Sequence, residues 1–204
     1  MTLQTLNNGK VFLPKTYNRD YFQERQVLEP RFFNMVLQWL NYLEMGGVNK
    51  IRSVVDVGCS TGLYLRAIKY IDSDIKLQGY DYYFESARPF THPEIVDEIT
   101  TDWIQVQPSD LALCLDTLEH IPIEQVDAFV DRLASVAGKF LILSICMVNE
   151  LGTDPNYALD PTHVTLRTKP WWRHQFAKRG LKEIPVPKHF LFWPQLLFFE
   201  VGSK

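Results

Sequence analysis

Apolar residues recur along this chain in two alternating patterns. From residue 29 to residue 45 they follow a helical period, which two glycines at 46 and 47 end. Beyond residue 50, short apolar runs typical of buried strands alternate with amphipathic helical stretches. We predict strands at residues 53–57, 75–80, 95–99, 111–115 and 140–145, and helices from 62 to 71 and from 123 to 137, the second closed by Gly138. This alternation predicts βαβ units, a mostly parallel sheet and helices on both of its faces.

The last part of the chain breaks the alternation. A helix is expected at residues 170–179, stopped by Gly180, and apolar runs follow at 181–186 and 190–201. Because only three residues, 187–189, separate these runs, they must pair as an antiparallel hairpin. We therefore predict an α/β sheet of about seven strands whose last strand is antiparallel.

Composition narrows the class of protein. The chain has 204 residues, 46% of them hydrophobic, which suits one globular domain. The formal net charge of −3 advertises no general affinity for nucleic acid, and no apolar run approaches the ~18 residues that span a bilayer. Three cysteines form no C-x-x-C pair, so reduced thiols in the cytoplasm are expected. We expect a monomer or homodimer without membrane contact.

The strongest local signal follows the first strand, in the segment VVDVGCSTG. Gly58 lets the backbone approach a ligand closely, and Gly62 opens the next helix. The spacing is neither that of a dinucleotide fingerprint nor that of a lysine-bearing phosphate loop. Asp56 would repel phosphate but suits an ammonium group. Asp81 ends the second strand, where an acid can bind both ribose hydroxyls, and Asp102 with Trp103 offers an acceptor and an aromatic plane to a base.

In these residues the chain resembles the class I S-adenosylmethionine-dependent methyltransferases, which have a Rossmann-like fold. The segments VVDVGCSTG, GYD, TTDW and DLALCLDTLEHIP match in order, although Ser60 replaces a glycine that is usual in the turn. The resemblance implies residues 49–204 as one compact methyltransferase domain and residues 1–48 as an arm and helix covering the cofactor side. It implies an S-adenosylmethionine site formed by Asp56, Gly58, Cys59, Ser60, Gly62, Asp81, Tyr82, Asp102, Trp103, Leu115 and Asp116. Tyr17 and Tyr21 of the arm either close over the cofactor or simply pack.

The segment after the fourth expected strand resembles two metal-assisted branches of that family, the ubiquinone-pathway and small-RNA O-methyltransferases. By that resemblance Asp116, Glu119, His120 and His163 would hold Mg²⁺, Mn²⁺ or Zn²⁺, which would lower the pKa of an acceptor hydroxyl. A metal-free site is the alternative, with His120 or His163 as catalytic base and Asp116 beside the reacting centre. A purely structural role is the third possibility.

The acceptor is less specified. A hydroxyl of a small molecule, a glycan or a nucleotide-linked sugar is preferred, and the ribose 2′-hydroxyl of RNA or a small-molecule amine are the alternatives. The chain could also be a non-catalytic cofactor-binding partner of another enzyme. One basic cluster could face phosphate or simply be solvated: Lys169, Arg173, Lys178, Arg179 and Lys182.

Overall fold

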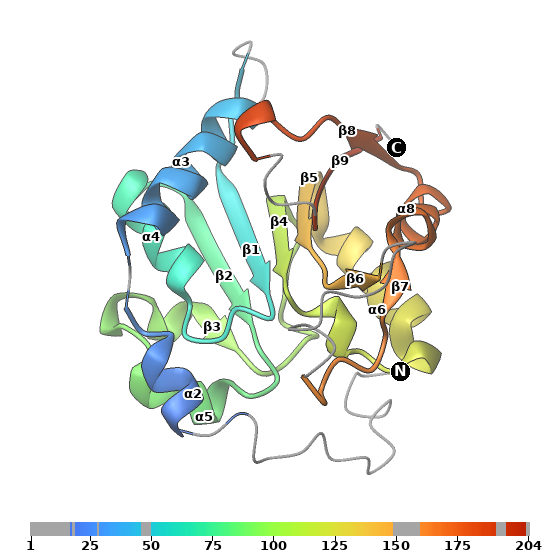
Figure 1. Ribbon diagram of the computed structural model, residues 1–204. Coiled ribbons are helices and arrows are strands. Elements are labelled where there is room, and N and C mark those ends of the chain that lie inside the picture. The colour runs from blue at the N-terminus through green and yellow to red at the C-terminus, as the bar shows by residue number, and fades with distance from the viewer. Residues whose placement is uncertain are drawn as a thin grey trace.

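One twisted sheet organises the protein. The computed structural model describes residues 17, 19–27, 29–45, 50–148, 160–190 and 195–202. Within that part, seven strands pair in the order β3-β2-β1-β4-β5-β9-β8 (Figure 1). The pairs among β3, β2, β1, β4 and β5 are parallel, while β9 runs antiparallel to both β5 and β8. The strands are β1 (Ser53–Val57), β2 (Lys76–Tyr80), β3 (Ile99–Thr100), β4 (Ser109–Leu115), β5 (Ala137–Ser144), β8 (Leu181–Ile184) and β9 (Leu196–Val201).

Helices cover both faces of the sheet, as predicted. Figure 1 shows α3 (Pro30–Leu43) and α4 (Leu63–Ile71) on one side and α6 (Ile123–Val136) and α8 (Lys169–Ala177) on the other. Because successive strand residues point to opposite faces, Val54 belongs to the same buried cluster as Trp39 on the first side, whereas Val55 belongs to that of Trp172 on the second. The short helices are α2 (Arg19–Glu24), α5 (Phe84–Ala87), η1 (Arg88–Phe90), η2 (Pro93–Glu98), η3 (Leu118–His120) and η4 (Lys188–Phe190).

Three boundaries predicted from the sequence are wrong. Residues 93–98 form a 3-10 helix instead of a strand, since Pro93 sits at its first turn and leaves only residues 99–100 to pair with β2. Gly138 does not close α6 but lies inside β5, where a Cβ would come within 2.8 Å of the Ser109 carbonyl oxygen. The last strand begins at Leu196 instead of residue 190, which ends a 3-10 helix, and residues 191–194 lie outside the described part.

Further features complete the framework. A second, two-stranded parallel sheet pairs β6 (Met147–Val148) with β7 (Arg167–Thr168), which the sequence did not indicate. Cys59, Cys114 and Cys146 are all buried, and no disulfide joins them in the described part of the chain. The expected end of the first long helix at residues 46–47 and most of the arm, residues 1–16, lie outside the described part. Among the described helices, none has both the length and the apolarity to cross a membrane.

Candidate functional site

Three residues of the turn between β1 and α4 have a left-handed backbone conformation. Gly58, Ser60 and Gly62 have φ values of +83°, +51° and +74°. A Cβ on Gly58 would overlap the Thr117 hydroxyl, so the close approach of this turn to the end of β4 admits only glycine. The turn also uses its own backbone donors, because the N–H groups of Gly58 and Cys59 both donate to the Tyr80 carbonyl oxygen.

Two of the predicted acids, Asp56 and Asp81, lie at this turn and differ in their hydrogen bonding. Asp56 is only 1% exposed, and its Oδ2 has no hydrogen-bond partner among the described residues. Burial, together with the neighbouring Asp81 carboxyl, raises the pKa of Asp56 to about 8. Asp81 accepts hydrogen bonds from the N–H groups of Ser60 (2.8 Å) and Tyr83 (2.7 Å), and these partly offset the burial that raises its pKa.

Two adjoining pockets open where the parallel strands end. The larger, about 430 Å³, is here called the acidic pocket because Asp56, Asp116, Glu119 and Asp160 all line it. The smaller, about 150 Å³, is called the tyrosine pocket and is lined by aromatic residues and Asp81. Tyr17, Tyr21, Gly58, Ser60, Asp116 and His120 line both, so the two pockets form one continuous site. Ligands of open α/β sheets bind at this edge.

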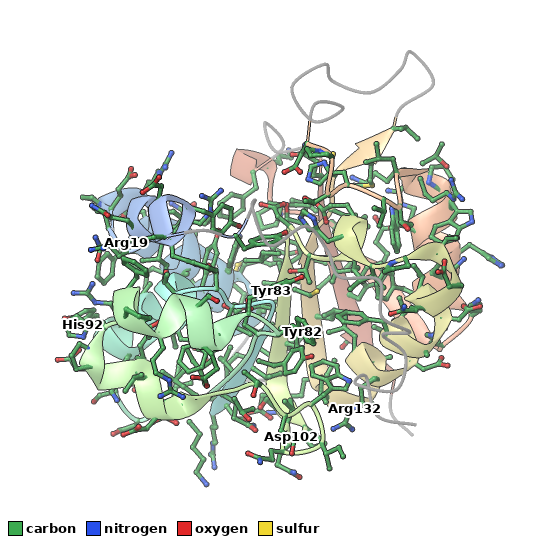
Figure 2. The ribbon with its side chains drawn as sticks, turned by 90° about the horizontal axis from the view of Figure 1, so that it is seen from below. Arg19, Tyr82, Tyr83, His92, Asp102 and Arg132 are labelled. Atoms are coloured by element: carbon green, nitrogen blue, oxygen red, sulfur yellow. The ribbon has the colours of Figure 1, made fainter. Side chains whose placement is uncertain are left out.

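Most predicted cofactor residues line these pockets. Cys59, Ser60 and Leu115 line the acidic pocket, and Tyr82 lines the tyrosine pocket with 51% of its surface exposed. Gly62 does not line either pocket but starts α4, where a Cβ would come within 2.6 Å of Ile95. Figure 2 shows Tyr82 and Tyr83 side by side, their ring centroids 5.0 Å apart.

Asp102 and Trp103 lie apart from the described pocket walls, so the expected adenine contact has no support in the geometry. Asp102 binds its own turn, accepting from Ile104 N–H (2.9 Å) and from Gln105 Nε2 (3.2 Å), and Figure 2 shows it below Tyr82. The Trp103 ring is buried in the core, stacked at 5.7 Å on Phe129. Phe129 does line the tyrosine pocket, so Trp103 supports the pocket wall from behind.

Asp116 and Glu119 follow the end of β4. Asp116 takes a left-handed φ of +49°, and the Ser144 hydroxyl donates to its Oδ1 at 2.5 Å. Glu119 is buried; its Oε1 accepts from Cys146 N–H at 3.0 Å, while its Oε2 has no hydrogen-bond partner in the described residues. Burial and the nearby Asp116 carboxyl raise the pKa of Glu119 to about 8. A positively charged partner in this pocket would therefore stabilise the ionised form of both carboxyl groups.

The hydrogen bonds around His120 select one tautomer of its ring. Its Nδ1 lies 3.2 Å from the Thr162 carbonyl oxygen, which can only accept, so Nδ1 carries the proton. The Thr162 hydroxyl lies 2.9 Å from the same nitrogen and itself donates to Asp160 Oδ1 at 2.6 Å. Burial and His163 lower the pKa of His120 to about 4, so the ring is neutral and Nε2 keeps its lone pair.

Three of the four predicted metal ligands come together. One ligand atom from each of Glu119, His120 and His163 lies within 4.8 Å of the other two. Asp116 does not belong to this group, although it lines the same pocket. His163 is brought there because the N–H groups of Val164 and Thr165 both donate to the Glu119 carbonyl oxygen at 2.9 Å. The buried Glu119 carboxylate and two imidazoles in one pocket suit a divalent cation.

The arm supplies residues that the sequence reading missed or left open. Tyr17 stacks on Tyr83, with ring centroids 4.8 Å apart, and its hydroxyl lies 3.3 Å from His120 Nδ1. Tyr21, predicted from the sequence either to bind the cofactor or simply to pack, lines both pockets. Arg25 also lines the acidic pocket. A lone arginine in a polar arm carries no spacing signal, so sequence alone had no means to select it.

The basic cluster is largely neutralised within the fold. Arg173 forms two hydrogen bonds to the Glu183 carboxylate, Lys178 pairs with Asp127, and Arg179 pairs with both Asp127 and Asp131. These ion pairs join α8 to β8, and the two residues that follow α8 to α6. They favour the structural interpretation of the cluster over a phosphate-facing one.

Comparisons with known proteins bear on the fold. No protein-family model matches the chain, and no curated protein sequence matches it. Solved structures do match: an O-methyltransferase family protein from Burkholderia thailandensis has a TM-score of 0.58 at 16% identity, covering 84% of this chain and 57% of that one. Magnesium protoporphyrin IX methyltransferase from Synechocystis PCC 6803, solved with bound SAH, has a TM-score of 0.57 at 19% identity, covering 98% and 93%.

A SAM-dependent methyltransferase from Archaeoglobus fulgidus is similar at a TM-score of 0.58 and 13% identity, covering 82% of this chain and 92% of that one. This chain thus spans little more than half of the Burkholderia protein but nearly all of the other two. At such identities the likeness concerns architecture alone. With its strand order and its antiparallel β9, this chain has the class I methyltransferase fold.

Proposed function

We propose that the protein transfers a methyl group from S-adenosylmethionine to a hydroxyl oxygen of a small molecule or glycan, with a divalent cation at Glu119, His120 and His163. The observation that carries the cofactor assignment is Asp56. Asp56 lines the acidic pocket and is 1% exposed, and its buried Oδ2 has no hydrogen-bond partner among the described residues. Such a carboxyl costs stability unless a ligand pairs with it. The ammonium of an amino acid is the matching partner.

The pocket residues fit the rest of that cofactor. Asp81 lines the tyrosine pocket and keeps lone pairs for ribose hydroxyls after accepting two backbone hydrogen bonds. The rings of Tyr82, Tyr83 and Phe129 give that pocket the apolar walls that a base needs. When bound, the cofactor supplies an electrophilic methyl group on a sulfonium. The protein's own task is to hold the acceptor in line and to take its proton.

The acceptor end favours oxygen chemistry assisted by a cation. A neutral His120 with a pKa of about 4 is a weak base for an alcohol, since the driving force for proton transfer is small. Glu119 keeps an unpartnered buried oxygen beside the two histidines. A cation held there would ionise Glu119 and lower the pKa of a hydroxyl bound next to it. His120 and His163 would then act as neutral ligands, held in place by Thr162 and the Glu119 backbone.

Calorimetric titration tests both the cofactor assignment and the cation site. Metal-stripped protein is titrated with S-adenosylmethionine and then with Mn²⁺ or Mg²⁺, using wild type, His163→Ala and His92→Ala. His92 is the matched control, because it lines neither pocket and Figure 2 shows it at the far edge of the molecule. We expect cofactor binding in all three proteins and a metal signal that disappears only in His163→Ala.

The outcomes separate the alternatives. If wild type binds no S-adenosylmethionine with or without metal, the transferase proposal is wrong. A metal signal that His163→Ala leaves intact, or the absence of one in wild type, would remove the cation from the proposal. Formation of S-adenosylhomocysteine in the presence of vicinal diols, catechols or sugars would then identify the acceptor, whereas amines or RNA as the sole acceptors would refute oxygen transfer to a small molecule.

A further inference from the structure

Asp160 adjoins both histidines of the acidic pocket. It lines this pocket, and its Oδ1 accepts hydrogen bonds from the Thr162 hydroxyl at 2.6 Å and from the Thr162 N–H at 2.9 Å. Its Oδ2 lies 3.7 Å from Nε2 of His163. Thr162 is in turn next to His120, since its hydroxyl oxygen lies 2.9 Å from Nδ1 of that ring. One carboxylate therefore neighbours one histidine directly and the other through a threonine.

The Thr162 hydroxyl has one proton, and its neighbours decide where that proton goes. It can be donated to the Asp160 carboxylate or to an unprotonated Nδ1 of His120, but not to both. The carboxylate is the closer and the charged acceptor, and Thr162 is only 2% exposed, so water does not compete for the proton. The proton therefore goes to Asp160, and the Thr162 oxygen offers only lone pairs to His120. The Thr162 carbonyl oxygen, 3.2 Å from Nδ1, can also only accept, and the Tyr17 hydroxyl at 3.3 Å can do the same.

A proton on Nδ1 leaves the lone pair of the His120 ring on Nε2. A metal-binding histidine uses its unprotonated nitrogen, and the hydrogen bond at the other nitrogen selects the tautomer and orients the ring. Nε2 is the nitrogen that remains for the group with Glu119 and His163, because Thr162 engages Nδ1. Asp160 is not among the described residues whose ligand atoms all lie within 4.8 Å of one another. Its position suits a residue that orients the ligands instead of one that joins them.

Resting on the proposed function, we infer that Asp160 is a positioning residue that acts through the Thr162 hydroxyl to keep His120 in the tautomer that binds the cation. Without the carboxylate, the Thr162 hydroxyl loses its acceptor and donates to Nδ1 of His120 instead. This donation favours the other tautomer, whose proton is on Nε2, the nitrogen that the cation needs. The affinity for the metal then falls although Glu119, His120 and His163 are all unchanged.

Two measurements on the same variants test this role. Calorimetry with Mn²⁺ gives the metal affinity, and the nitrogen NMR shifts of the imidazoles in metal-free protein give the tautomer, the His120 signals being identified by their loss in His120→Gln. Asp160→Ala should lower the Mn²⁺ affinity about 10–100-fold, the usual effect of removing a hydrogen-bonding group behind a metal-bound histidine, and should shift the proton of His120 toward Nε2. Asp160→Asn should restore most of both signals, because an amide oxygen still accepts from the Thr162 hydroxyl. Asp97→Ala is the control, an exposed acid that lines neither pocket, and should match wild type.

A double substitution tests whether the effect passes through Thr162. Thr162→Val removes the hydroxyl and leaves the carbonyl acceptor, so His120 should keep its tautomer, and Asp160→Ala should have little further effect on metal affinity in that background. Equal effects of Asp160→Ala with and without the Thr162 hydroxyl would overturn the inference, as would a proton on Nε2 of His120 in wild type.

Asp160→Asn separates positioning from charge. A loss of metal affinity as large as that of Asp160→Ala would also overturn the inference, since the charge of Asp160 or its direct binding to the metal would then be the cause. Failure of wild type to bind any metal contradicts the cation of the proposed function itself. The two failures are distinguishable, because the tautomer is compared in metal-free protein and tests the role of Asp160 without any metal.

Discussion

Replacing Asp56 by asparagine should make the cofactor-free protein more stable while it destroys cofactor binding. The substitution keeps the shape of the side chain and removes its charge. In the native state burial and Asp81 hold the pKa of Asp56 at about 8, whereas an unfolded chain restores the ordinary value of 3.8. Native protein thus binds one proton more than unfolded protein throughout the interval between these two values.

The sign and the size of the stability change in Asp56→Asn follow from that pH interval. Because the unfolded state binds fewer protons, the free energy of unfolding of wild type falls as pH rises from about 4 and levels off above about 8. Each pH unit costs ~1.4 kcal/mol, so the accumulated cost at pH 7 is at most ~4 kcal/mol. Asparagine avoids this cost but leaves an amide without an acceptor, a penalty of ~1–3 kcal/mol. The net stabilisation is therefore ~1–3 kcal/mol near neutral pH, or a few degrees in Tm.

Thermal denaturation of cofactor-free protein between pH 5.5 and 8.5 measures this effect. The gap in Tm between Asp56→Asn and wild type should widen steadily up to about pH 8, while S-adenosylhomocysteine should stabilise wild type alone. Asp74→Asn is the control, an exposed acid that lines neither of the two pockets. If Asp56→Asn is less stable than wild type at pH 8, or if the gap does not vary with pH, Asp56 is not the strained ligand-binding acid described above.

Three further predictions concern the glycine turn, the arm and the surface ion pairs. Gly58→Ala should lower cofactor affinity more than tenfold because its methyl group would overlap Thr117. The control Gly180→Ala, with a similar φ of +81° and open space around it, should cost ~1 kcal/mol of stability and leave cofactor affinity intact. Equal cofactor affinities of the two variants in calorimetry would contradict this prediction. Tyr17→Ala should weaken cofactor binding severalfold and Tyr17→Phe should not, since the ring, more than the hydroxyl, forms the pocket wall; the same loss in both would instead implicate the hydroxyl. Arg179→Gln should lower the free energy of unfolding by ~2 kcal/mol in urea denaturation, since its side chain is only 10% exposed and bonds to α6; a large loss of activity with no loss of stability would return the basic cluster to substrate binding.

Local pattern was sufficient for much of the framework. The strand at residues 53–57 was predicted with its observed bounds because three valines in five residues lead directly into a glycine turn. The helices that became α3, α4 and α6 were predicted within a few residues for a similar reason, their apolar stripes being unambiguous. The errors fell where the local pattern does not fix a boundary. Residue 190 belongs to a long apolar run but ends a 3-10 helix, and the place of Gly138 in β5 depends on the close approach of Ser109.

Some residues of the candidate site could likewise be located from the sequence, whereas others were placed only by the tertiary structure. Asp56, Gly58, Asp81 and Asp116 could be located from the sequence because they end parallel strands, whose carboxyl ends must meet at one edge. His163 was only a candidate until its neighbours donated hydrogen bonds to the Glu119 backbone and brought it beside His120. Asp116, adjacent in sequence to the other predicted ligands, was excluded from their group by the same geometry.

What the sequence determined by itself was therefore the sheet, its ligand-binding edge and the acids that end its strands, because these follow from burial and strand direction alone. What only the tertiary structure decided was which side chains from distant segments meet there: Tyr17 on Tyr83, Arg25 at the acidic pocket, Thr162 on His120. Such meetings depend on long-range packing and hydrogen bonds between loops, which leave no periodic trace in the chain. The tertiary structure also paired basic residues of α8 and of the turn after it with acids of β8 and α6, a neutralisation that no count of charges along the sequence could reveal.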